Sequence, residues 1–146
     1  MKLSDADDSC GVKFTVKVRV SDVELVSLLS RAALLLYTSR LEPFGLAPLE
    51  ANACGTPVVG IAEGGVRESI QHEQNGLLVN HDDPEELATA IERIIDDPCF
   101  ARELRLRALR DVNDRWRIKD AIDQLESALI KVQQNGMPRS HDGRHA

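Results

Sequence analysis

Two glutamates, Glu42 and Glu50, are separated by seven residues that contain a Pro-Phe-Gly turn and the start of a predicted helix. Each ionised carboxylate can only accept hydrogen bonds. It can accept one from each O–H group of a vicinal diol, such as that of a ribose or a hexose. Neither carboxylate is expected to contact a phosphate, because like charges repel. A glutamate near a helix start is also common for its interaction with the helix dipole alone. The spacing by itself therefore leaves an ordinary helix start as an alternative.

The helix that follows the turn has the chemistry of an anion site. Gly45 is its expected N-cap, so the peptide N–H groups of Leu46 and Ala47 are free, while Pro48 has none to offer. Free N–H groups and the positive end of the helix dipole favour an anion. Gly45 has no side chain, which lets a ligand approach the backbone closely. The pattern predicts a site for a phosphorylated sugar.

A second glycine-containing turn, Gly64-Gly65, precedes another short helix. Consecutive peptide N–H groups in such a turn can form a concave anion-binding nest. A Gly-Gly pair is also found in turns that bind nothing, and both interpretations stay open at this point.

Alternating apolar runs and helix signals position these turns. A run that is apolar on both faces, 33–37, predicts a central parallel strand. A helix over 46–54 ends at Gly55; a strand over 57–61, a short helix over 66–71 and a strand over 77–79 follow. Both turns thus leave strands at their carboxyl ends, where parallel sheets bind ligands.

The flanking segments extend this pattern. Residues 12–20 alternate apolar and polar side chains and predict a strand with one wet face. Ser21 and Glu24 form a capping box for a helix to about residue 31, with its apolar face formed by Val23, Leu25, Val26, Leu28 and Leu29. Asp83 and Pro84 begin a further helix, and another starts at Pro98. A last helix covers about 115–133, and Trp116 is expected to pack it onto the domain. The apolar positions of this last helix alternate in steps of four and three: Ile118, Ile122, Leu125, Leu129 and Val132.

The fold class that results is α/β: a Rossmann-like parallel sheet of four strands with helices on both faces and right-handed crossovers, followed by three helices. Residues 1–11 are expected to be a disordered lead or one of cloning origin. Residues 12–134 form the predicted ligand-binding domain, and 135–146 a flexible tail.

Composition excludes several functions for a chain of 146 residues. A net charge of −6 argues against a nucleic-acid surface. No apolar run approaches the roughly 18 residues of a membrane span, and the acidic first residues are unlike a signal peptide. Three cysteines without a CxxC spacing indicate neither a disulfide framework nor a zinc site. The expected location is the cytoplasm, with a full-length parent that could associate with the inner membrane face.

The segments SRLEPFGLAPLEANACGTPVVGIAEGGVRESI and NGLLVNHDDPEELATAIERIIDDP closely resemble the glycosyl transferases group 1 family, family four of the retaining glycosyltransferases. The resemblance covers about residues 12–130. It implies one half of a GT-B fold, in which two Rossmann-like domains enclose a cleft. It also implies a hexosyl-type transfer from a UDP- or GDP-sugar, with no metal and no cofactor beyond this donor substrate.

Individual residues match the family motif. The resemblance implies that Glu50 takes the ribose hydroxyls of the nucleotide and that Glu42, the expected catalytic residue, reaches the donor sugar. Phe44, Gly45, Leu46 and Ala47 match the stretch whose amides meet the sugar and diphosphate, with the loop of Gly64 and Gly65 facing the same cleft.

The sequence departs from the family pattern in what it lacks. The family's N-terminal acceptor domain, the first strands of the donor domain and the Arg/Lys pair that neutralises the diphosphate have no counterpart, and Val18 stands where a Gly is usual. We therefore expect the C-terminal donor-binding part of a transferase, inactive alone, with self-association through an exposed sheet edge and an acceptor that is a saccharide, lipid or small molecule. A sugar-nucleotide epimerase of the same fold and a non-enzymatic flavodoxin-like interaction domain remain alternatives.

Overall fold

A parallel sheet of three strands forms the centre of the computed structural model, which describes residues 11–40, 43–80 and 83–135. The strands are β1 (Leu35–Tyr37), β2 (Val58–Ile61) and β3 (Gly76–Val79), in that order across the sheet. Leu35 pairs with Val58, and Val58 pairs with Gly76 on its other side. The central position of β2 follows from its residues, because it is buried over most of its length and β-branched side chains suit a pleated core.

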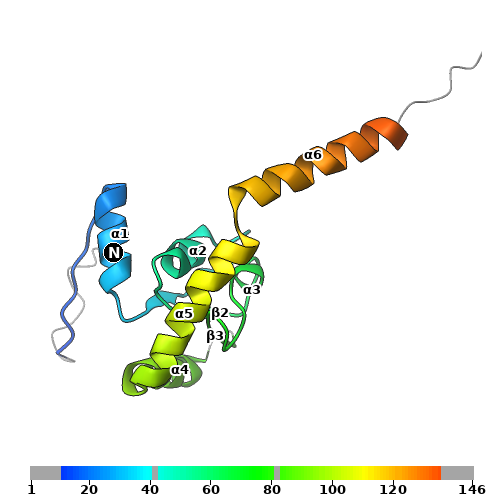
Figure 1. The fold of residues 1–146 in the computed structure, drawn as a ribbon. Helices are drawn as coiled ribbons and strands as arrows, with labels where there is room; N and C mark the ends of the chain where they lie inside the picture. Colours follow the sequence, from blue (N-terminus) through cyan, green and yellow to red (C-terminus); the bar gives the residue numbers. More distant parts are fainter. Residues whose placement is uncertain (1–10, 41–42, 81–82, 136–146) are drawn as a thin grey trace, which may run out of the picture.

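Six helices complete the described part of the chain (Figure 1). They alternate with the strands as far as α4 and then follow one another: α1 (Asp22–Arg31), α2 (Leu46–Ala53), α3 (Val66–Ser69), α4 (Pro84–Asp96), α5 (Pro98–Arg115) and α6 (Ile118–Asn135). The strand–helix alternation confirms the predicted α/β class with a parallel sheet.

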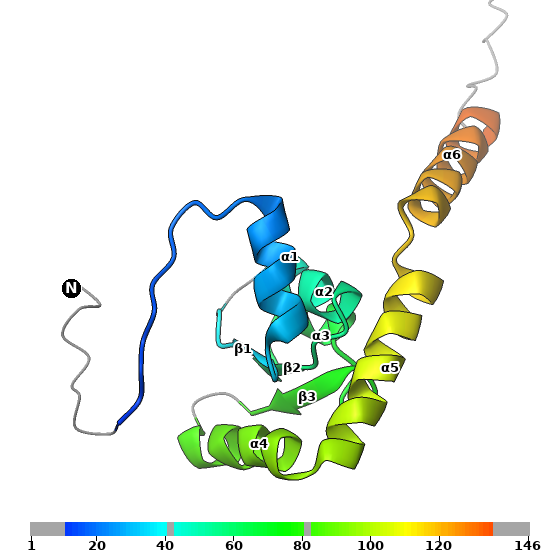
Figure 2. The ribbon, with the colours of Figure 1, turned by 60° about the vertical axis from the view of Figure 1, so that its left-hand side comes forward.

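Two apolar clusters lie on opposite faces of the sheet. Val58 packs with Ala51 of α2 and Val66 of α3, whereas its neighbour Val59 faces the other way and packs with residues of β3, α4 and α5. Successive strand side chains point to opposite faces, so one buried strand serves both clusters. Helices therefore cover both faces, as predicted; Figure 2 shows α4 beneath β3 and α5 running alongside the body.

The predicted helix ends are confirmed where their chemistry is local. The Ser21 hydroxyl accepts from the Glu24 N–H at 3.3 Å, and the Asp83 carboxylate accepts from both Glu85 N–H and Glu86 N–H at 3.0 Å. The second half of the Ser21 capping box does not form, since the Glu24 carboxylate pairs with Lys17 instead.

The prediction that residues 33–37 form a central strand is wrong. The strand is shorter, starts at Leu35 and lies at the edge of the sheet, and Leu36 is 44% exposed. An apolar run indicates that both faces of a strand can be covered, but it does not show how many strands lie beside it. No described strand pairs with the outer edge of β1.

The strand predicted over 12–20 is also absent, and with it the fourth strand. These residues have no regular structure, and the apolar side chains of Val12, Phe14, Val16 and Val18 are exposed. Figures 1 and 2 both place the segment outside the body. A strand obtains its backbone hydrogen bonds from a neighbouring strand, and this segment pairs with none of the described strands. The apolar face of α1 is likewise only partly covered, with Val23 and Val26 exposed.

Arg105 on α5 ties together turns that are distant in sequence. Its Nη2 donates to the carbonyl oxygens of Ala32 at 2.7 Å and Ala33 at 3.1 Å, just before β1. Its Nη1 lies 3.5 Å from the carbonyl oxygen of Gly55, just before β2. One guanidinium thus holds the amino ends of two strands against the long helix.

The last helix begins later than predicted, at Ile118, because Trp116 and Arg117 interrupt the helical backbone after α5. From there α6 projects away from the body (Figures 1 and 2). The predicted lead and tail lie outside the described residues, apart from Gly11 and Asn135. Among the described helices, none combines the length and apolar character that crossing a membrane requires.

Candidate functional site

The two predicted glycine turns are in direct contact at the carboxyl end of the sheet. A side chain on Gly65 would collide with the other turn, because its Cβ would come within 2.6 Å of the Phe44 nitrogen and closer still to the Phe44 Cα. No side chain larger than hydrogen fits between the two backbones. The loop after β2 and the loop after β1 therefore form one continuous wall.

The start of α2 has the features of an anion site. Gly45 caps the helix with φ 79° and ψ 62°, a left-handed conformation that glycine adopts without strain, and no side chain caps the first turn. That turn contains no acidic residue, and Leu46 is 63% exposed. The positive end of the helix dipole thus has no internal counter-charge from its own first turn.

The Gly64-Gly65 loop has the backbone form of an amide nest. Gly64 has φ 53° and Gly65 has φ −67°, so the two residues have opposite hand. Arg67 holds the loop from the other side, where its Nε donates to the carbonyl oxygen of Ala62 at 2.6 Å. Successive N–H groups in such a backbone point into one concavity, which suits an anion.

Glu50 lines a groove of about 370 Å³ between α1 and α2. Its side chain is exposed and is directed to this groove rather than to the core. Apart from two carboxylates, the lining is apolar or weakly polar: Asp22, Leu25, Val26, Leu29, Glu50, Ala53 and Cys54. A carboxylate beside an apolar wall can accept from a diol while a flat ring lies against the aliphatic side chains.

Asp22 is a candidate that the sequence analysis missed. It occupies the first turn of α1 and lines the same groove as Glu50, 28 positions later in the chain. Its type and position are explained by the helix start alone, so only the packing of α1 against α2 reveals it as a second acceptor.

Arg40 is a second residue that the sequence analysis passed over. It follows β1, and its Nε lies 3.7 Å from the Glu63 Oε2 in the loop after β2. The ion pair bridges the same two loops that meet at Gly65, and it places a guanidinium at the carboxyl end of the sheet. Its position in the loop that follows a predicted strand is the signal that could have identified it.

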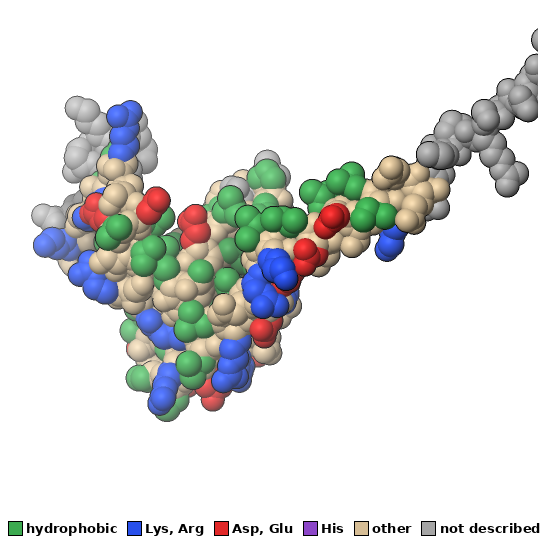
Figure 3. Space-filling model, turned by 45° about the horizontal axis from the view of Figure 1, so that its top comes forward, with side chains coloured by type: hydrophobic (Ala, Val, Ile, Leu, Met, Phe, Trp, Pro, Cys, Tyr) green, Lys and Arg blue, Asp and Glu red, His purple; other side chains and the backbone are tan. Residues whose placement is uncertain are grey.

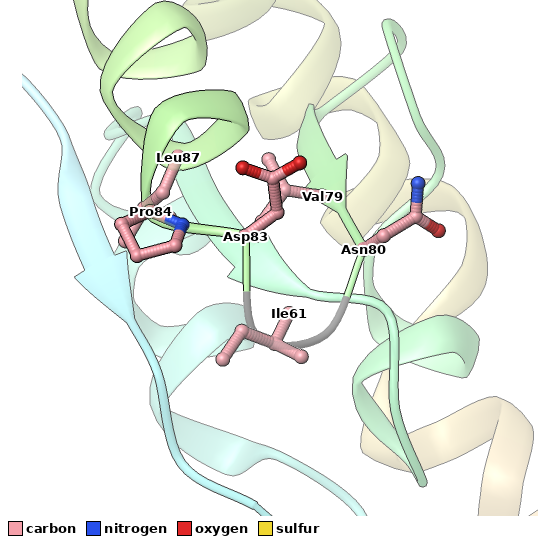
Figure 4. A pocket seen from close by; sticks show the side chains of 6 residues that line it. All are labelled: Ile61, Val79, Asn80, Asp83, Pro84 and Leu87. Carbon is pink, nitrogen blue, oxygen red and sulfur yellow. The ribbon is translucent and has the colours of Figure 1, made fainter.

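A smaller hollow next to β3 has a structural explanation (Figure 4). It measures about 130 Å³, and its polar lining residues are Asn80 and Asp83. Asp83 caps α4, and the Asn80 N–H donates to the Glu86 carboxylate at 2.9 Å. Since these polar groups already make hydrogen bonds at the start of α4, the hollow presents mainly apolar side chains to a ligand.

Trp116 reaches the same wall from the end of α5. Its ring meets that of Phe44 edge to face, with centroids 5.4 Å apart, and the Arg115 guanidinium lies 5.3 Å from the Trp116 ring centroid. The expected anchor therefore fastens the junction before α6 to the Phe44 turn.

Most of the predicted site residues thus converge. Phe44, Gly45, Gly64 and Gly65 lie in one wall, and Leu46 and Ala47 open the helix whose next turn carries Glu50. Glu42 lies outside the described residues, so its role stays a prediction. The arrangement can hold an anion at the wall and a diol in the adjoining groove.

Comparisons with known proteins agree with this fold. The family profile named Glycosyl transferases group 1 matches residues 2–111. The chain belongs to this glycosyltransferase family, and the predicted resemblance is confirmed.

The relatives that match this chain are longer. D-inositol 3-phosphate glycosyltransferase 1 of Catenulispora acidiphila is 37% identical over 80% of this chain and 28% of its own length. HepE of Anabaena, solved in complex with UDP, superposes with a TM-score of 0.67 at 30% identity over 71% of this chain and 29% of that protein. Sucrose-phosphate synthase from Thermosynechococcus elongatus gives 0.68 at 33% identity over 77% and 28%. The chain therefore spans less than a third of the length of these relatives.

Proposed function

We propose that this chain is the donor-binding part of a glycosyltransferase that moves a sugar from a nucleotide-diphosphate sugar to an acceptor with retention of anomeric configuration. The observation that supports it best is the wall of two glycine loops beside the uncapped start of α2, with Glu50 in the adjoining groove. Relatives supply the chemical class of ligand, since HepE has been solved with UDP and also with UDP-glucose.

In this proposal each part of the ligand meets a matching group. The diphosphate lies at the N–H groups of Leu46 and Ala47, where the helix dipole is positive. The ribose diol donates to Glu50, and the base lies along the aliphatic side of the α1–α2 groove. Glu42 serves the donor sugar, and no metal takes part.

Arg40 modifies the expectation for affinity. The sequence analysis found no counterpart of the Arg/Lys pair that neutralises the diphosphate. The Arg40 guanidinium supplies a cation, but it is engaged by Glu63. A diphosphate must compete with that carboxylate, so we expect a dissociation constant on the order of 1 mM for the chain alone. We also propose that these residues bind donor without appreciable transfer, because the match covers only 28% of the length of these relatives.

Titration by ligand-observed NMR tests the site. UDP-glucose and GDP-mannose should each be added to the wild-type chain, to Glu50→Gln and to Glu92→Gln, a matched change at an exposed position on α4. Loss of one charged hydrogen-bonding acceptor should weaken binding about tenfold in Glu50→Gln and leave Glu92→Gln unchanged. Equal affinity in both variants would refute the assignment of Glu50.

A chelator separates the metal-free part of the proposal from the rest. Excess EDTA should leave the nucleotide-sugar titration of the wild-type chain unchanged, because peptide N–H groups and not a cation are assigned to the diphosphate. A loss of binding that added Mg²⁺ or Mn²⁺ restores would contradict this assignment.

A further inference from the structure

The end of α5 contacts both sides of the wall that the two glycine loops form. The Trp116 ring, which follows α5, meets the Phe44 ring edge to face, with centroids 5.4 Å apart. The Arg115 Nη2 donates to the carbonyl oxygen of Glu68 at 3.1 Å. Glu68 belongs to α3, which begins directly after Gly65. The loop after β1 is therefore held through a ring, and the loop after β2 through a guanidinium.

A buried hydrogen-bond network holds Arg115 in place. Its Nη1 donates to the Asp111 Oδ1 at 2.8 Å, and the Asp111 side chain is only 13% exposed. The other Asp111 oxygen accepts from the Asn75 Nδ2 at 2.9 Å. Asn75 is fully buried, and its amide also bonds to the Ser69 carbonyl oxygen and the Gln71 N–H, where α3 ends. Bonds to charged groups in a buried network are strong, so the guanidinium has little freedom to move.

Trp116 has an equally fixed position. Its N–H donates to the Val112 carbonyl oxygen at 3.1 Å, and the Arg115 guanidinium lies 5.3 Å from the centroid of its ring. Figure 3 shows Lys and Arg side chains beside acidic ones where α6 leaves the body, which is this end of α5. Cation–π and edge-to-face contacts both have preferred geometries, so they orient the ring as well as hold it.

Glycine residues make the wall dependent on what packs against it. Gly45 and Gly64 have positive φ values of 79° and 53°. Gly65 has room for no side chain against the Phe44 backbone, so the two loops touch without interlocking side chains. Glycine has the widest choice of backbone conformations. The directions of the N–H groups in this wall are therefore set by neighbouring contacts, and the ring of Phe44 is the side chain next to Gly45 through which such a contact acts.

We propose that Asp111, Arg115 and Trp116, here called the α5 clamp, position the two glycine loops so that their N–H groups converge on the diphosphate of the donor. This inference rests on the proposed function. The clamp acts through the loops and not on the ligand, so Arg115 and Trp116 are positioning residues. None of the three clamp residues lines the groove of Glu50, so binding of the base and the ribose should not depend on them.

Variants of Trp116 test the clamp by ligand-observed NMR. UDP-glucose and GDP-mannose are compared with uridine and guanosine, which lack the diphosphate. Trp116→Leu should weaken nucleotide-sugar binding about fivefold and leave nucleoside binding within about twofold of wild type. Trp116→Phe keeps an aromatic edge and should bind nucleotide sugar within about twofold of wild type. Unchanged nucleotide-sugar binding in Trp116→Leu, or equal weakening of nucleosides, would overturn the proposal.

Arg107 provides a matched control for Arg115 on the same helix. It too pairs with a carboxylate four positions earlier, that of Glu103 at 2.9 Å, and donates to a backbone carbonyl oxygen, that of Glu73 at 3.1 Å. Both of these partners lie outside the wall. Arg115→Gln should weaken nucleotide-sugar binding about threefold or more, whereas Arg107→Gln should leave it unchanged. Equal effects would mean that Arg115 acts through general stability, which would refute its positioning role.

Fluorescence of Trp116 gives a readout that a merely structural role would not change. Because the clamp holds the loops that bind the diphosphate, ligand binding at the wall and the ring contact should be linked. The emission of this single tryptophan, excited where nucleotides absorb little, should change saturably with nucleotide sugar and stay constant with nucleoside. A constant emission while NMR shows nucleotide-sugar binding would overturn the linkage.

Failure of the clamp and failure of the proposed function give different results. If the proposed function is wrong, the wild-type chain does not bind nucleotide sugar or Glu50→Gln does not weaken the binding. If only the clamp is wrong, both of those results stand, and the variants of Trp116 and Arg115 bind nucleotide sugar like the wild-type chain.

Discussion

The body of the molecule and its two ends carry equally regular patterns of apolar residues. Only in the body are these apolar side chains packed against other elements. Within the body, β2 is flanked by two strands and covered on both faces. At the ends, residues 12–20 and α6 expose their apolar side chains. Residues 12–20 do not form the predicted strand, whereas α6 forms the predicted helix.

The difference follows from where each element finds its hydrogen bonds. A helix satisfies its backbone within itself, so α6 forms although its apolar stripe is bare. A strand depends on its neighbour, and 12–20 pairs with neither edge of the described sheet, so it forms no strand. Periodicity therefore predicts a helix more safely than a strand when part of the surroundings is missing.

The largest expected effect contrasts a leucine of the body with one of α6. Leu104 is fully buried in α5, and Leu104→Ala should lower the free energy of unfolding by about 2–5 kcal/mol through lost burial and a cavity. Leu125→Ala removes the same atoms from an exposed site and should change it by less than about 0.5 kcal/mol at dilute, monomeric concentrations. Urea unfolding measures both. Similar losses would show that α6 is packed in solution.

A smaller effect is expected where the two glycine loops touch. Gly65→Ala places a Cβ against the backbone of Phe44, and we expect a loss of about 1–3 kcal/mol in the free energy of unfolding. Because Gly65 itself has φ −67°, the loss would come from this contact and not from a left-handed backbone. Unchanged stability in Gly65→Ala would mean that the loops are farther apart in solution.

The junction between the body and α6 can be measured through its ring pair. A double-mutant cycle with Phe44→Leu and Trp116→Leu should give a coupling energy of about 0.5–1.5 kcal/mol for the edge-to-face contact. Fluorescence of Trp116, the one tryptophan in the sequence, reports the same contact. Additive single effects would mean that the rings do not meet.

The smallest effect concerns the surface of the body. The Arg93 guanidinium, which hydrogen-bonds to the Glu73 carboxylate, lowers the pKa of that group below its ordinary value of 4.5. A lowered folded-state pKa contributes stability above pH 4.5 and loses it as the pH falls further. Glu73→Gln should therefore cost slightly at neutral pH and progressively less as the pH falls below 4.5. A cost that grows on acidification would reverse the assigned direction.

Much of the site could be predicted because its chemistry is local. The cap residues Ser21 and Asp83, the N-cap position of Gly45 and the position of Glu50 on α2 all follow from residue types at short spacing. These features depend on the backbone within one or two turns of each residue, which the sequence presents directly.

Contacts between distant segments could not be predicted in the same way. Asp22 joins the Glu50 groove through the packing of α1 on α2, and Arg40 meets Glu63 through the pairing of β1 with β2. Nor could the edge position of β1 be deduced, because an apolar run does not report how many strands lie beyond it.

The three carbonyl contacts of Arg105 have a consequence for the order in which the chain becomes structured during synthesis. Its bond to Ala32 spans 73 positions, so the entry to β1 waits for a residue that the ribosome adds much later. Until then β1 can pair with β2, but the turn that leads into it lacks this tie to the long helix. The turn before β1 therefore reaches its final set of hydrogen bonds only after α5 has been made.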